Sequence, residues 1–575
     1  MKSHWNKIFD LEPSIEQVPV EIPKFLWTIW NMREDLQRLC PMKSIEGRLG
    51  IVIWWVLWGY KEYSEATHRY SKNNDAFLDS VVPQTQTIGT LPVTQLMKGI
   101  WDLFPNVQKS FPSLSSRDGK RFIAWFYLVF VPSDKAFPCI SEAIALELKN
   151  HRNELYSIQN FDRDFSELSV EEKSLCEQES TKALSYLDEV PFEAFSQKKE
   201  TPAIPEGTQS GVNIVGHATG ELGVGEDVRM LSQALNTVNL PHSAFRFPRV
   251  NMARNEDFTL NSLISEDLPH KTNVFCLPGF DCFYSAVSMG ESLFKGRFNI
   301  GYCQWELPYW PKPLNVVFDL MDEMWASSKF TQLSVQSEAT VPVKLMPMVV
   351  ELPPFHPRER TSFGIPEDKF LFMFTFDFNS SVHRKNPHAV VESFLKAFPK
   401  NDDVALIIKS SNRDVTNPDV QWVQSLCEKD KRIIWIHETL NRSDFLALLN
   451  CCDTFVSLHR SEGFGRNIAE AMLLEKPVIV TNWSGNTDFC TSENSLLVDY
   501  KIAQLESGQY SFWEGQHWAD PLIEHAAEQM KSTFALSWEQ RTALGTKARK
   551  TIEIGYNAKK VGQIYRAHLK ELKLI

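Results

Sequence analysis

The hydrophobic positions of this chain follow one pattern before about residue 200 and a different one after it. In residues 1–200, apolar side chains recur at helical spacing, in units of a mixed helix, a proline and serine turn, and an apolar helix. From residue 208 onward, short apolar runs typical of strands alternate with amphipathic stretches typical of helices. The pattern predicts an α/β fold with parallel sheets, preceded by a mainly α-helical region.

The helical region of residues 1–200 contains an internal repeat of about 71 residues, because Ile29-Trp30 returns as Ile100-Trp101. Each unit ends in a strongly apolar segment, Leu49–Trp58 in the first and Phe122–Val131 in the second. Segments of this length are well short of the ~20 residues that span a bilayer. They are either buried core helices or, since the chain has 17 tryptophans, a surface that inserts into a membrane interface.

Two series of predicted strands define two Rossmann-like halves, at residues 208–352 and 366–555. The first series is Val212–Val215, Asn273–Leu277, Phe298–Tyr302, Met324–Ala326 and Val343–Val349. The second series is Phe370–Phe376, Val404–Ile408, Ile433–Ile436, Thr454–Leu458, Val478–Thr481 and Leu496–Val498. Polar, proline-containing links at 196–210 and 352–366 separate these parts, and residues 556–575 follow as an amphipathic helix. We expect a ligand crevice between the carboxyl ends of the two sets of strands.

Composition and charge narrow the functional classes. A content of 43% hydrophobic and 23% charged residues is typical of a globular protein. The net charge of −12 argues against a nucleic-acid partner, because nucleic acids bind to basic protein surfaces. The ten cysteines form neither a disulfide framework nor a zinc pattern, and the N-terminus lacks the apolar core of a secretory signal. These features predict a cytoplasmic protein.

The densest candidate chemistry lies between Ser461 and Thr481. Glu462 falls in a loop with Gly463-Phe464-Gly465, and Glu470 stands eight residues later, early in the following helix. Glycines before a helix start leave N–H groups that suit a phosphate, and ionised carboxylates accept hydrogen bonds from hydroxyls. The stretch is therefore either a pocket for a nucleotide sugar or a glycine-rich turn beside two solvated glutamates.

Further candidates in the second half are cations that follow predicted strands. Arg384, Lys385 and Lys409 should lie on the side of the sheet that faces the crevice. Preplaced cations stabilise the negative charge that builds on a leaving phosphate, so these three are predicted to lie near a phosphate site. The alternative is that they are solvated surface cations.

The first half offers four candidates. A strand, a glycine-rich loop that contains Gly223, and a helix form an arrangement that can cradle a phosphate. His217, in the same loop, is either a structural hydrogen-bonding group or a catalyst. Trp305 and Glu306 follow a strand. Because aromatic rings stack on sugars and carboxylates accept hydrogen bonds from hydroxyls, these two residues could line a binding site for a sugar that acts as an acceptor. The alternative is a tryptophan that caps the core beside an exposed glutamate.

The region around both glutamates closely resembles the E-x7-E signature of retaining glycosyltransferases of family 4, which have the GT-B fold. The resemblance continues in His383–Pro387, Leu406–Ser410, Ser457–Arg460, Trp483–Phe489 and Leu496–Tyr500, and so covers most of residues 370–500. Two positions depart from the pattern. Arg466 stands where an aliphatic residue is usual, and Glu475 stands where glycine commonly closes the helix.

The resemblance implies a role for each candidate of the second half. Glu470 would hold the ribose hydroxyls of the nucleotide. Glu462, with the N–H groups around Gly463–Gly465, would hold hydroxyls of the transferred sugar. Lys385 and Lys409, with Arg384 as the close alternate, would grip the diphosphate.

For the first half, the resemblance implies that the loop with Gly223 approaches the donor diphosphate and that Trp305 and Glu306 lie on the acceptor side. It also implies that the helix of residues 556–575 crosses back to the first half. The resemblance implies that no metal or other cofactor is required, because the cationic side chains neutralise the charge of the diphosphate. Asp162-Arg163-Asp164 looks like a D-x-D metal motif, but its charged, non-strand context indicates a solvated face.

The sequence therefore predicts a metal-independent retaining glycosyltransferase that moves a sugar from a nucleotide-diphosphate sugar to a glycan or lipid-linked glycan acceptor. By analogy with the resembled family, the pathway is bacterial surface-polysaccharide biosynthesis. Two alternatives are a GT-B sugar-nucleotide epimerase and a non-catalytic scaffold whose tryptophan-rich region binds a protein partner. A further hypothesis places the protein at the inner face of a membrane through that region.

Overall fold

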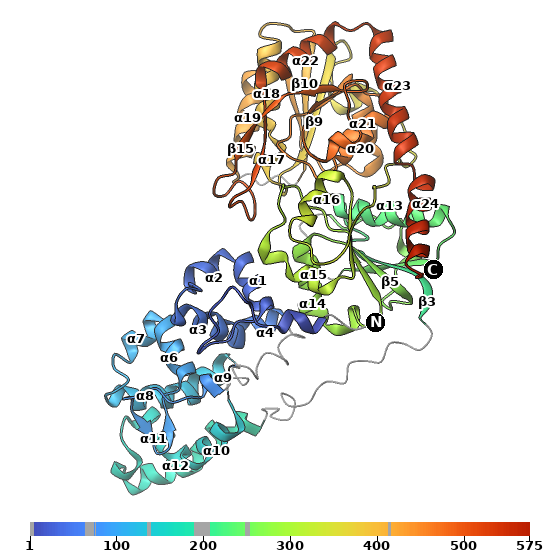
Figure 1. The fold of residues 1–575 in the computed structure, drawn as a ribbon. Helices are drawn as coiled ribbons and strands as arrows, with labels where there is room; N and C mark the ends of the chain where they lie inside the picture. Colours follow the sequence, from blue (N-terminus) through green and yellow to red (C-terminus); the bar gives the residue numbers. More distant parts are fainter. Residues whose placement is uncertain are drawn as a thin grey trace. The chain divides into compact units, whose positions relative to one another are not determined.

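The computed structural model describes residues 5–63, 74, 76–134, 140–188, 208–247, 254–411 and 416–575 (Figure 1). The chain forms two compact units, one of residues 204–283 and 296–575 and the other of residues 3–203 and 284–295. Residues 196–207, which belong to the predicted link, lie outside the described residues.

The helical unit repeats its helices at the offset found in the sequence. Helices α1 (Lys24–Met32), α2 (Glu34–Leu39) and α3 (Ile45–Trp54) correspond to α6 (Gln95–Leu103), α7 (Pro105–Ser110) and α8 (Arg117–Trp125). A π-helical turn continues each apolar helix, η2 (Trp55–Gly59) after α3 and η3 (Phe126–Phe130) after α8. The Trp30 indole N–H donates to the Cys40 carbonyl at 2.8 Å, and Trp101 donates to Phe111 at 2.8 Å. The same tryptophan bond thus ties the first helix of each repeat to the end of its second helix.

The apolar segments of both repeats supply the core of this unit. Ile51, Val52, Phe122 and Phe126 are buried. Among the described residues, no helix is both long enough and apolar enough to cross a bilayer. Shorter elements complete the unit: η1 (Trp5–Phe9), α4 (Tyr60–Glu62), β1 (Thr87–Ile88), β2 (Leu91–Pro92), α9 (Val131–Asp134), α10 (Glu142–Asn150), α11 (Arg152–Phe161), η5 (Phe165–Glu167), α12 (Val170–Ala183), η6 (Ser185–Asp188) and η8 (Glu291–Leu293).

The first α/β domain is built on a six-stranded sheet in the order β4-β3-β5-β6-β7-β8, with all neighbours parallel. Its strands are β3 (Gln209–Gly216), β4 (His242–Arg246), β5 (His270–Cys276), β6 (Phe298–Gly301), β7 (Glu323–Ala326) and β8 (Val343–Leu345). The connecting helices are α13 (Gly223–Thr237), η7 (Asn261–Leu263), α14 (Gly279–Met289), η9 (Lys312–Leu314), α15 (Val316–Leu320) and α16 (Lys329–Gln336). Helices cover the sheet, which explains the nearly continuous apolar runs of strands such as β3.

The second α/β domain has a six-stranded parallel sheet in the order β11-β10-β9-β12-β13-β14, the Rossmann order. Its strands are β9 (Phe370–Asp377), β10 (Val404–Ser411), β11 (Ile433–Ile436), β12 (Thr454–Ser457), β13 (Val478–Thr481) and β14 (Leu496–Val498). The helices are η10 (Arg360–Phe363), α17 (Val382–Lys385), α18 (Pro387–Ala397), α19 (Pro418–Lys429), α20 (Arg442–Cys451), α21 (Arg466–Leu473), η11 (Gly485–Asp488), α22 (Ile523–Ala535) and α23 (Trp538–Gly555). Every strand predicted from the sequence is present, although β8 extends only to Leu345.

The last helix, α24 (Ala558–Glu571), leaves the second domain and lies against the first (Figure 1). It approaches α13 so closely that a Cβ added at Gly562 would lie 2.3 Å from the Ala234 carbonyl oxygen. Tyr565 stacks on Trp325 at 5.1 Å between ring centroids, and His568 Nε2 lies 2.6 Å from Glu323 Oε1. Two parallel-sheet domains joined in this way form the GT-B fold, so the predicted fold class is confirmed.

Candidate active site

Two neighbouring strands at the centre of the second sheet bring three predicted residues together. Strand β9 is followed by α17, which carries Arg384 and Lys385, and β12 is followed by the loop that carries Glu462. Strands β9 and β12 are paired in parallel, so the segments that follow them meet at the same edge of the sheet. Side chains 77 residues apart in the sequence therefore converge on one point.

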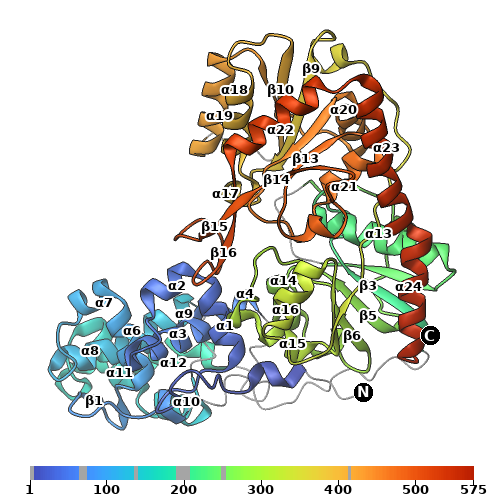
Figure 2. The ribbon, with the colours of Figure 1, turned by 45° about the horizontal axis from the view of Figure 1, so that its top comes forward.

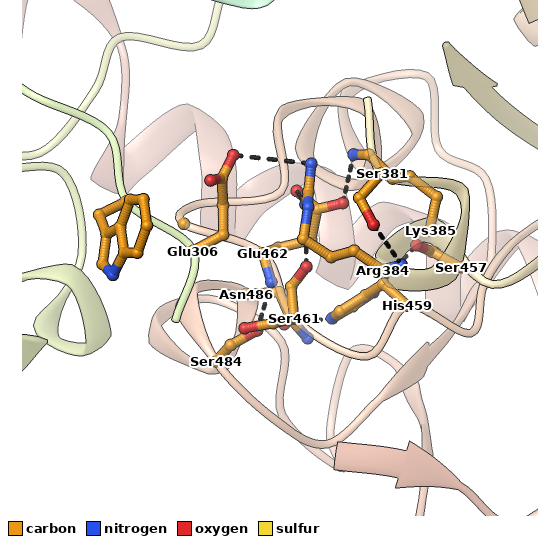
Figure 3. Close-up of polar contacts among 12 residues, drawn as sticks. Glu306, Ser381, Arg384, Lys385, Ser457, His459, Ser461, Glu462, Ser484 and Asn486 are labelled. Carbon is orange, nitrogen blue, oxygen red and sulfur yellow. Dashed lines mark hydrogen bonds and ion pairs between the residues drawn. The ribbon is translucent and has the colours of Figure 1, made fainter. Parts of the chain in front are cut away.

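Glu462 is held between two cations (Figure 3). Lys385 Nζ is hydrogen-bonded and ion-paired to Glu462 Oε1, and Arg384 Nη1 lies 3.3 Å from Glu462 Oε2. The backbone N–H of Glu462 donates to Ser484 Oγ at 2.8 Å. All three charged side chains are largely buried, with Arg384 the most enclosed at 5% exposure.

This arrangement keeps the carboxylate ionised. Burial by itself would raise the pKa of Glu462, but the charges of Lys385 and Arg384 outweigh that effect and lower it to about 2. Burial also lowers the pKa of Lys385, and the Glu462 carboxylate opposes that change. Two buried cations are fixed in place beside Glu462, and preplaced cations of this kind suit an anionic ligand.

Backbone geometry fixes the loop around Glu462. Gly465 has φ +96°, a left-handed conformation that glycine adopts without strain, and it directly precedes α21. The N–H of Gly485 donates to the Glu462 carbonyl at 2.9 Å, and a Cβ at Gly485 would lie 2.0 Å from the Gly463 carbonyl oxygen. The two glycine-containing loops therefore pack backbone against backbone, which only glycine at residue 485 permits.

His459, which was not among the predicted site residues, lies between the end of β12 and Glu462. Its ring nitrogens contact Ser457 Oγ at 3.0 Å and Asn486 Oδ1 at 3.0 Å (Figure 3). Burial lowers the pKa of His459, which favours the neutral imidazole. The ring thus links the end of β12 to the loop that contains Asn486.

Of the paired candidates Trp305 and Glu306 in the first domain, Glu306 reaches this cluster. Glu306 Oε1 lies 3.6 Å from Arg384 Nη2, and the hydroxyl of Tyr510 donates to Glu306 Oε2. Trp305 is only 7% exposed, and its indole N–H donates to the Tyr309 carbonyl at 2.8 Å. The tryptophan packs against Trp310 of its own domain and against Tyr510 and Phe512 of the second domain, whereas the glutamate beside it joins the charged cluster.

A hairpin that the sequence did not reveal covers this side. Strands β15 (Tyr500–Gln504) and β16 (His517–Pro521) extend from the second domain next to α17 (Figure 2). The Gln516 side-chain amide donates to the Tyr309 carbonyl at 2.6 Å and accepts from the Tyr309 N–H at 3.2 Å. Tyr510, which holds Glu306, lies in the loop between the two strands. The hairpin connects the second domain to Glu306 and Tyr309 of the first.

Glu470 is also paired, with a cation that was not predicted. Arg442 Nη1 lies 3.0 Å from Glu470 Oε2, and Nη2 lies 2.6 Å from Oε1, so the contact is bidentate. Arg442 Nη2 also lies 3.7 Å from Glu226 of the first domain. The rule that selected Arg384, a cation after the carboxyl end of a strand, would have found Arg442 after β11.

Arg466, the departure from the family pattern, has a partner of its own. Its Nη2 lies 2.5 Å from Asp227 Oδ1, and its Nη1 donates to the Val349 carbonyl at 3.1 Å. Asp227 is buried in α13, so this ion pair joins the first domain to α21 of the second. An aliphatic residue at 466 could not make this contact.

Three predicted residues lie outside the Glu462 cluster. Lys409 Nζ donates to the Ser410 carbonyl at 2.6 Å, and its side chain is buried. His217 Nε2 lies 3.5 Å from Asp281 Oδ2. Gly223 is the first residue of α13, and no atom lies within 4 Å of a Cβ built there, so the helix start is open.

Replacing Lys409 by methionine is expected to remove a pH-dependent part of the stability. Burial lowers the pKa of Lys409 to about 8 despite the nearby Glu438 and Asp377 carboxylates. Between about pH 8 and pH 10.5, the ordinary pKa of lysine, the unfolded chain therefore binds more protons than the folded chain. Lys409 thus makes the free energy of unfolding increase with pH over this range. At about 1.4 kcal/mol per pKa unit, the rise is at most about 3 kcal/mol.

Apparent melting temperatures at about pH 7 and about pH 10 measure this effect. The advantage of Lys409→Met over the unaltered protein should shrink as the pH rises. Lys531→Met, which changes an exposed lysine of the same domain, should follow the unaltered protein at both values. An equal pH response in Lys409→Met would contradict the expectation.

The chemistry of the site can now be compared with known families. Residues 356–550 match the family described as Glycosyl transferases group 1. The match covers the second α/β domain, including Arg384, Lys385, Glu462 and Glu470. Residues 356–550, about a third of the chain, are therefore similar to group 1 glycosyltransferases. No curated protein sequence matches the chain.

Three solved structures share part of this arrangement at low sequence identity. Sucrose-phosphate synthase from Thermosynechococcus elongatus is 12% identical with a TM-score of 0.47, and the alignment covers 63% of this chain and 99% of that one. HepE from Anabaena, solved with UDP and glucose, is 13% identical with a TM-score of 0.45, over 63% of this chain and 100% of that one. TarM from S. aureus is 13% identical with a TM-score of 0.40, and the alignment covers 55% of this chain and 57% of that one.

Within the described ranges, no three or more His, Cys, Asp or Glu side chains gather as a potential metal site. In the D-x-D segment, Asp164 lies 3.0 Å from Lys120 Nζ, and Asp162 lies 3.7 Å from Arg117 Nε. These carboxylates are paired with cations of α8.

Proposed function

We propose that the chain is a retaining glycosyltransferase that moves a sugar from a nucleotide-diphosphate sugar to a glycan or lipid-linked glycan acceptor. The observation that carries the proposal is Glu462 between Lys385 and Arg384, at the carboxyl ends of the central strands of a domain that is similar to group 1 glycosyltransferases. Two buried cations and a carboxylate side by side fit a ligand with a charged diphosphate next to a polyol.

In this mechanism Lys385 and Arg384 bind the donor diphosphate. As the bond between the anomeric carbon and the phosphate oxygen breaks, negative charge builds on that phosphate and the sugar gains oxocarbenium character. The two cations stabilise this charge most in the transition state. Glu462 then accepts hydrogen bonds from hydroxyls of the transferred sugar, because its low pKa keeps it ionised.

The acceptor hydroxyl attacks the anomeric carbon on the face that the phosphate leaves. Its oxygen forms the new glycosidic bond, and its proton passes to the departing phosphate oxygen, so the anomeric configuration is retained. Glu306, held by Arg384 and Tyr510, is placed to accept a hydrogen bond from the acceptor on the side of the first domain. The proposal gives no diphosphate role to Lys409, because its ammonium is bound within its own strand.

The donor nucleotide extends from this point toward α13. Gly223 leaves an open helix start whose N–H groups suit the diphosphate, and Glu470 would hold the ribose hydroxyls. Metal independence is part of the proposal, because the cations supply the neutralising charge. We further propose a cytoplasmic protein whose helical unit contacts a partner protein or a membrane surface.

Glu470→Ala is expected to abolish nucleotide-sugar binding. A panel of nucleotide-diphosphate sugars, screened by ligand-observed NMR, should yield one saturable donor for the unaltered protein. The variant should lose that signal, because removing a group that makes charge-assisted hydrogen bonds to a ligand costs about 1.5–3 kcal/mol per bond. Calorimetry with the same donor gives the affinity of each protein.

The matched control is Glu528→Ala, which removes an exposed carboxylate on α22 and should bind the donor normally. Incubation with donor and a glycan acceptor in a chelator should still give product if no metal takes part. Unchanged donor affinity in Glu470→Ala, or an epimerised donor without acceptor, would count against the proposal.

A further inference from the structure

We propose that Arg442 is a positioning residue of the donor site: it orients the Glu470 carboxylate toward the hydroxyls of the donor ribose, and Glu226 of the first domain completes its surroundings. This inference rests on the proposed function, since it takes Glu470 as the ribose-binding group. It adds a residue that neither the sequence motifs nor the family pattern selects.

The local structure places Arg442 next to Glu470. Arg442 is the first residue of α20, and Asn441 caps that helix by accepting from the Asp444 N–H at 2.9 Å. Helix α20 follows β11, and Glu470 lies in α21, which follows β12. Both residues therefore lie beyond the carboxyl ends of strands in one sheet, although 28 residues separate them in the sequence.

The contact fixes the plane of the carboxylate. A guanidinium presents its N–H donors in a rigid fork, and here Nη1 and Nη2 each meet one oxygen of Glu470, at 3.0 and 2.6 Å. An ionised carboxylate has about four lone-pair sites, so one on each oxygen stays available to a hydroxyl donor. Two hydroxyls on adjacent ribose carbons match two such sites that are held in one plane.

Glu470 depends on this partner because it is only 1% exposed. A buried carboxylate without a cation would be costly, and it would rotate or become protonated instead of accepting two hydroxyls. Arg442 is more exposed, with 29% of its side chain accessible. The pair therefore has its exposed part on the arginine.

The first domain contributes the second carboxylate around Arg442. Glu226 Oε1 lies 3.7 Å from Arg442 Nη2, and Glu226 Oε2 lies 2.8 Å from Arg229 Nε. Glu226 is in the first turn of α13, three residues after Gly223. The cation that orients Glu470 is thus shared with the helix start that faces the diphosphate, so both halves of the protein shape the ribose pocket.

The test compares ribonucleotides with their dideoxy counterparts. Calorimetry on the full chain would measure Kd for UDP, GDP and ADP and for the 2′,3′-dideoxy form of each, which lacks both ribose hydroxyls. The unaltered protein should bind one ribonucleotide roughly 10- to 100-fold tighter than its dideoxy form, the range for a hydrogen bond to a charged group. Arg442→Gln should lower the affinity for that ribonucleotide to the level of the dideoxy form, and leave the dideoxy affinity nearly unchanged. Arg442→Lys, which keeps the charge but loses the fork, should fall between them.

Arg432→Gln is the matched control. Arg432 also makes a bidentate pair in this domain, with Nη2 at 2.6 Å and Nε at 3.0 Å from Asp430, but it lies before β11 rather than after it. This variant should keep the full preference for the ribonucleotide, while melting curves show whether either variant loses stability.

The possible outcomes separate this inference from the proposed function. If Arg442→Gln weakens both forms equally, Arg442 is only structural, and if it tightens the ribonucleotide, Arg442 competes with ribose; either result overturns the inference. If the unaltered protein binds ribo and dideoxy forms equally, the inference fails while the proposed function stands. If it binds none of the nucleotides and no nucleotide sugar, both fail together.

Discussion

Glu462→Gln lowers the rate of sugar transfer by on the order of 10²–10³-fold, the effect typical of removing one preorganised group that acts on the transition state. Glutamine has the same shape but cannot balance the charge of Lys385 and Arg384, and its NH2 group replaces an acceptor of sugar hydroxyls with a donor. Binding of a nucleoside diphosphate without sugar should persist or tighten, because the two cations no longer have a carboxylate that competes with phosphate. Initial rates with the donor found in the screen, and calorimetry with its nucleoside diphosphate, measure the two effects.

The control for this experiment is Glu528→Gln, the same chemical change at an exposed position of the same domain. It should transfer sugar at the normal rate. If Glu462→Gln also transferred sugar normally, Glu462 could not be the group that holds the reacting sugar, and the proposed mechanism would be wrong. Equal losses of transfer and of nucleoside diphosphate binding would instead indicate that the loop had collapsed.

Gly485→Ala should reduce both donor binding and transfer by roughly 10²-fold or more, the scale of a displacement of about 1 Å at a catalytic site. The added Cβ would lie 2.0 Å from the Gly463 carbonyl oxygen and 2.8 Å from the Phe464 Cα, and both are backbone atoms that cannot rotate away. The loop that carries Glu462 must therefore move. Transfer rates and the apparent melting temperature of the variant measure the consequence.

Gly555→Ala is the matched substitution, because no atom lies within 4 Å of a Cβ at that position. It should leave both rate and melting temperature nearly unchanged. Normal activity in Gly485→Ala would mean that the position of the loop between Glu462 and Gly465 has no influence on the reaction.

The fold followed from the sequence wherever strands are buried on both sides. Runs such as Leu371–Met373 and Val478–Val480 are uniformly apolar, and their short length indicates buried strands instead of helices. Strand β4 was missed because His242–Arg246 mixes polar and apolar residues at the edge of its sheet. The hairpin of β15 and β16 was missed because its strands carry exposed residues such as Lys501 and Ile502.

The central residues of the site were predictable because one rule places them. Arg384, Lys385 and Glu462 each follow a strand at the carboxyl edge of one sheet, and topology brings such residues together. The same rule also pointed to Lys409, but a lysine has a long flexible stem, and here it turns back to the Ser410 carbonyl. Sequence position gives the location of a Cα and not the direction of its side chain.

Contacts between the two α/β domains were beyond sequence reasoning. The Tyr510 hydroxyl meets Glu306 across 204 residues, and Arg466 meets Asp227 across 239 residues. Neither partner has a local pattern that indicates the other. The departure at Arg466 was visible as an unusual residue, but its meaning appears only when α13 and α21 are placed together.

Helix α24 has a consequence for how the protein is made. The ribosome completes the strands of the first α/β domain by Leu345, yet the helix that packs on α13 is encoded by residues 558–571. Until synthesis has passed residue 571, Trp325 lacks its partner Tyr565, and the surface beside Ala234 has no covering helix. The first domain therefore matures last, although it is translated before the second.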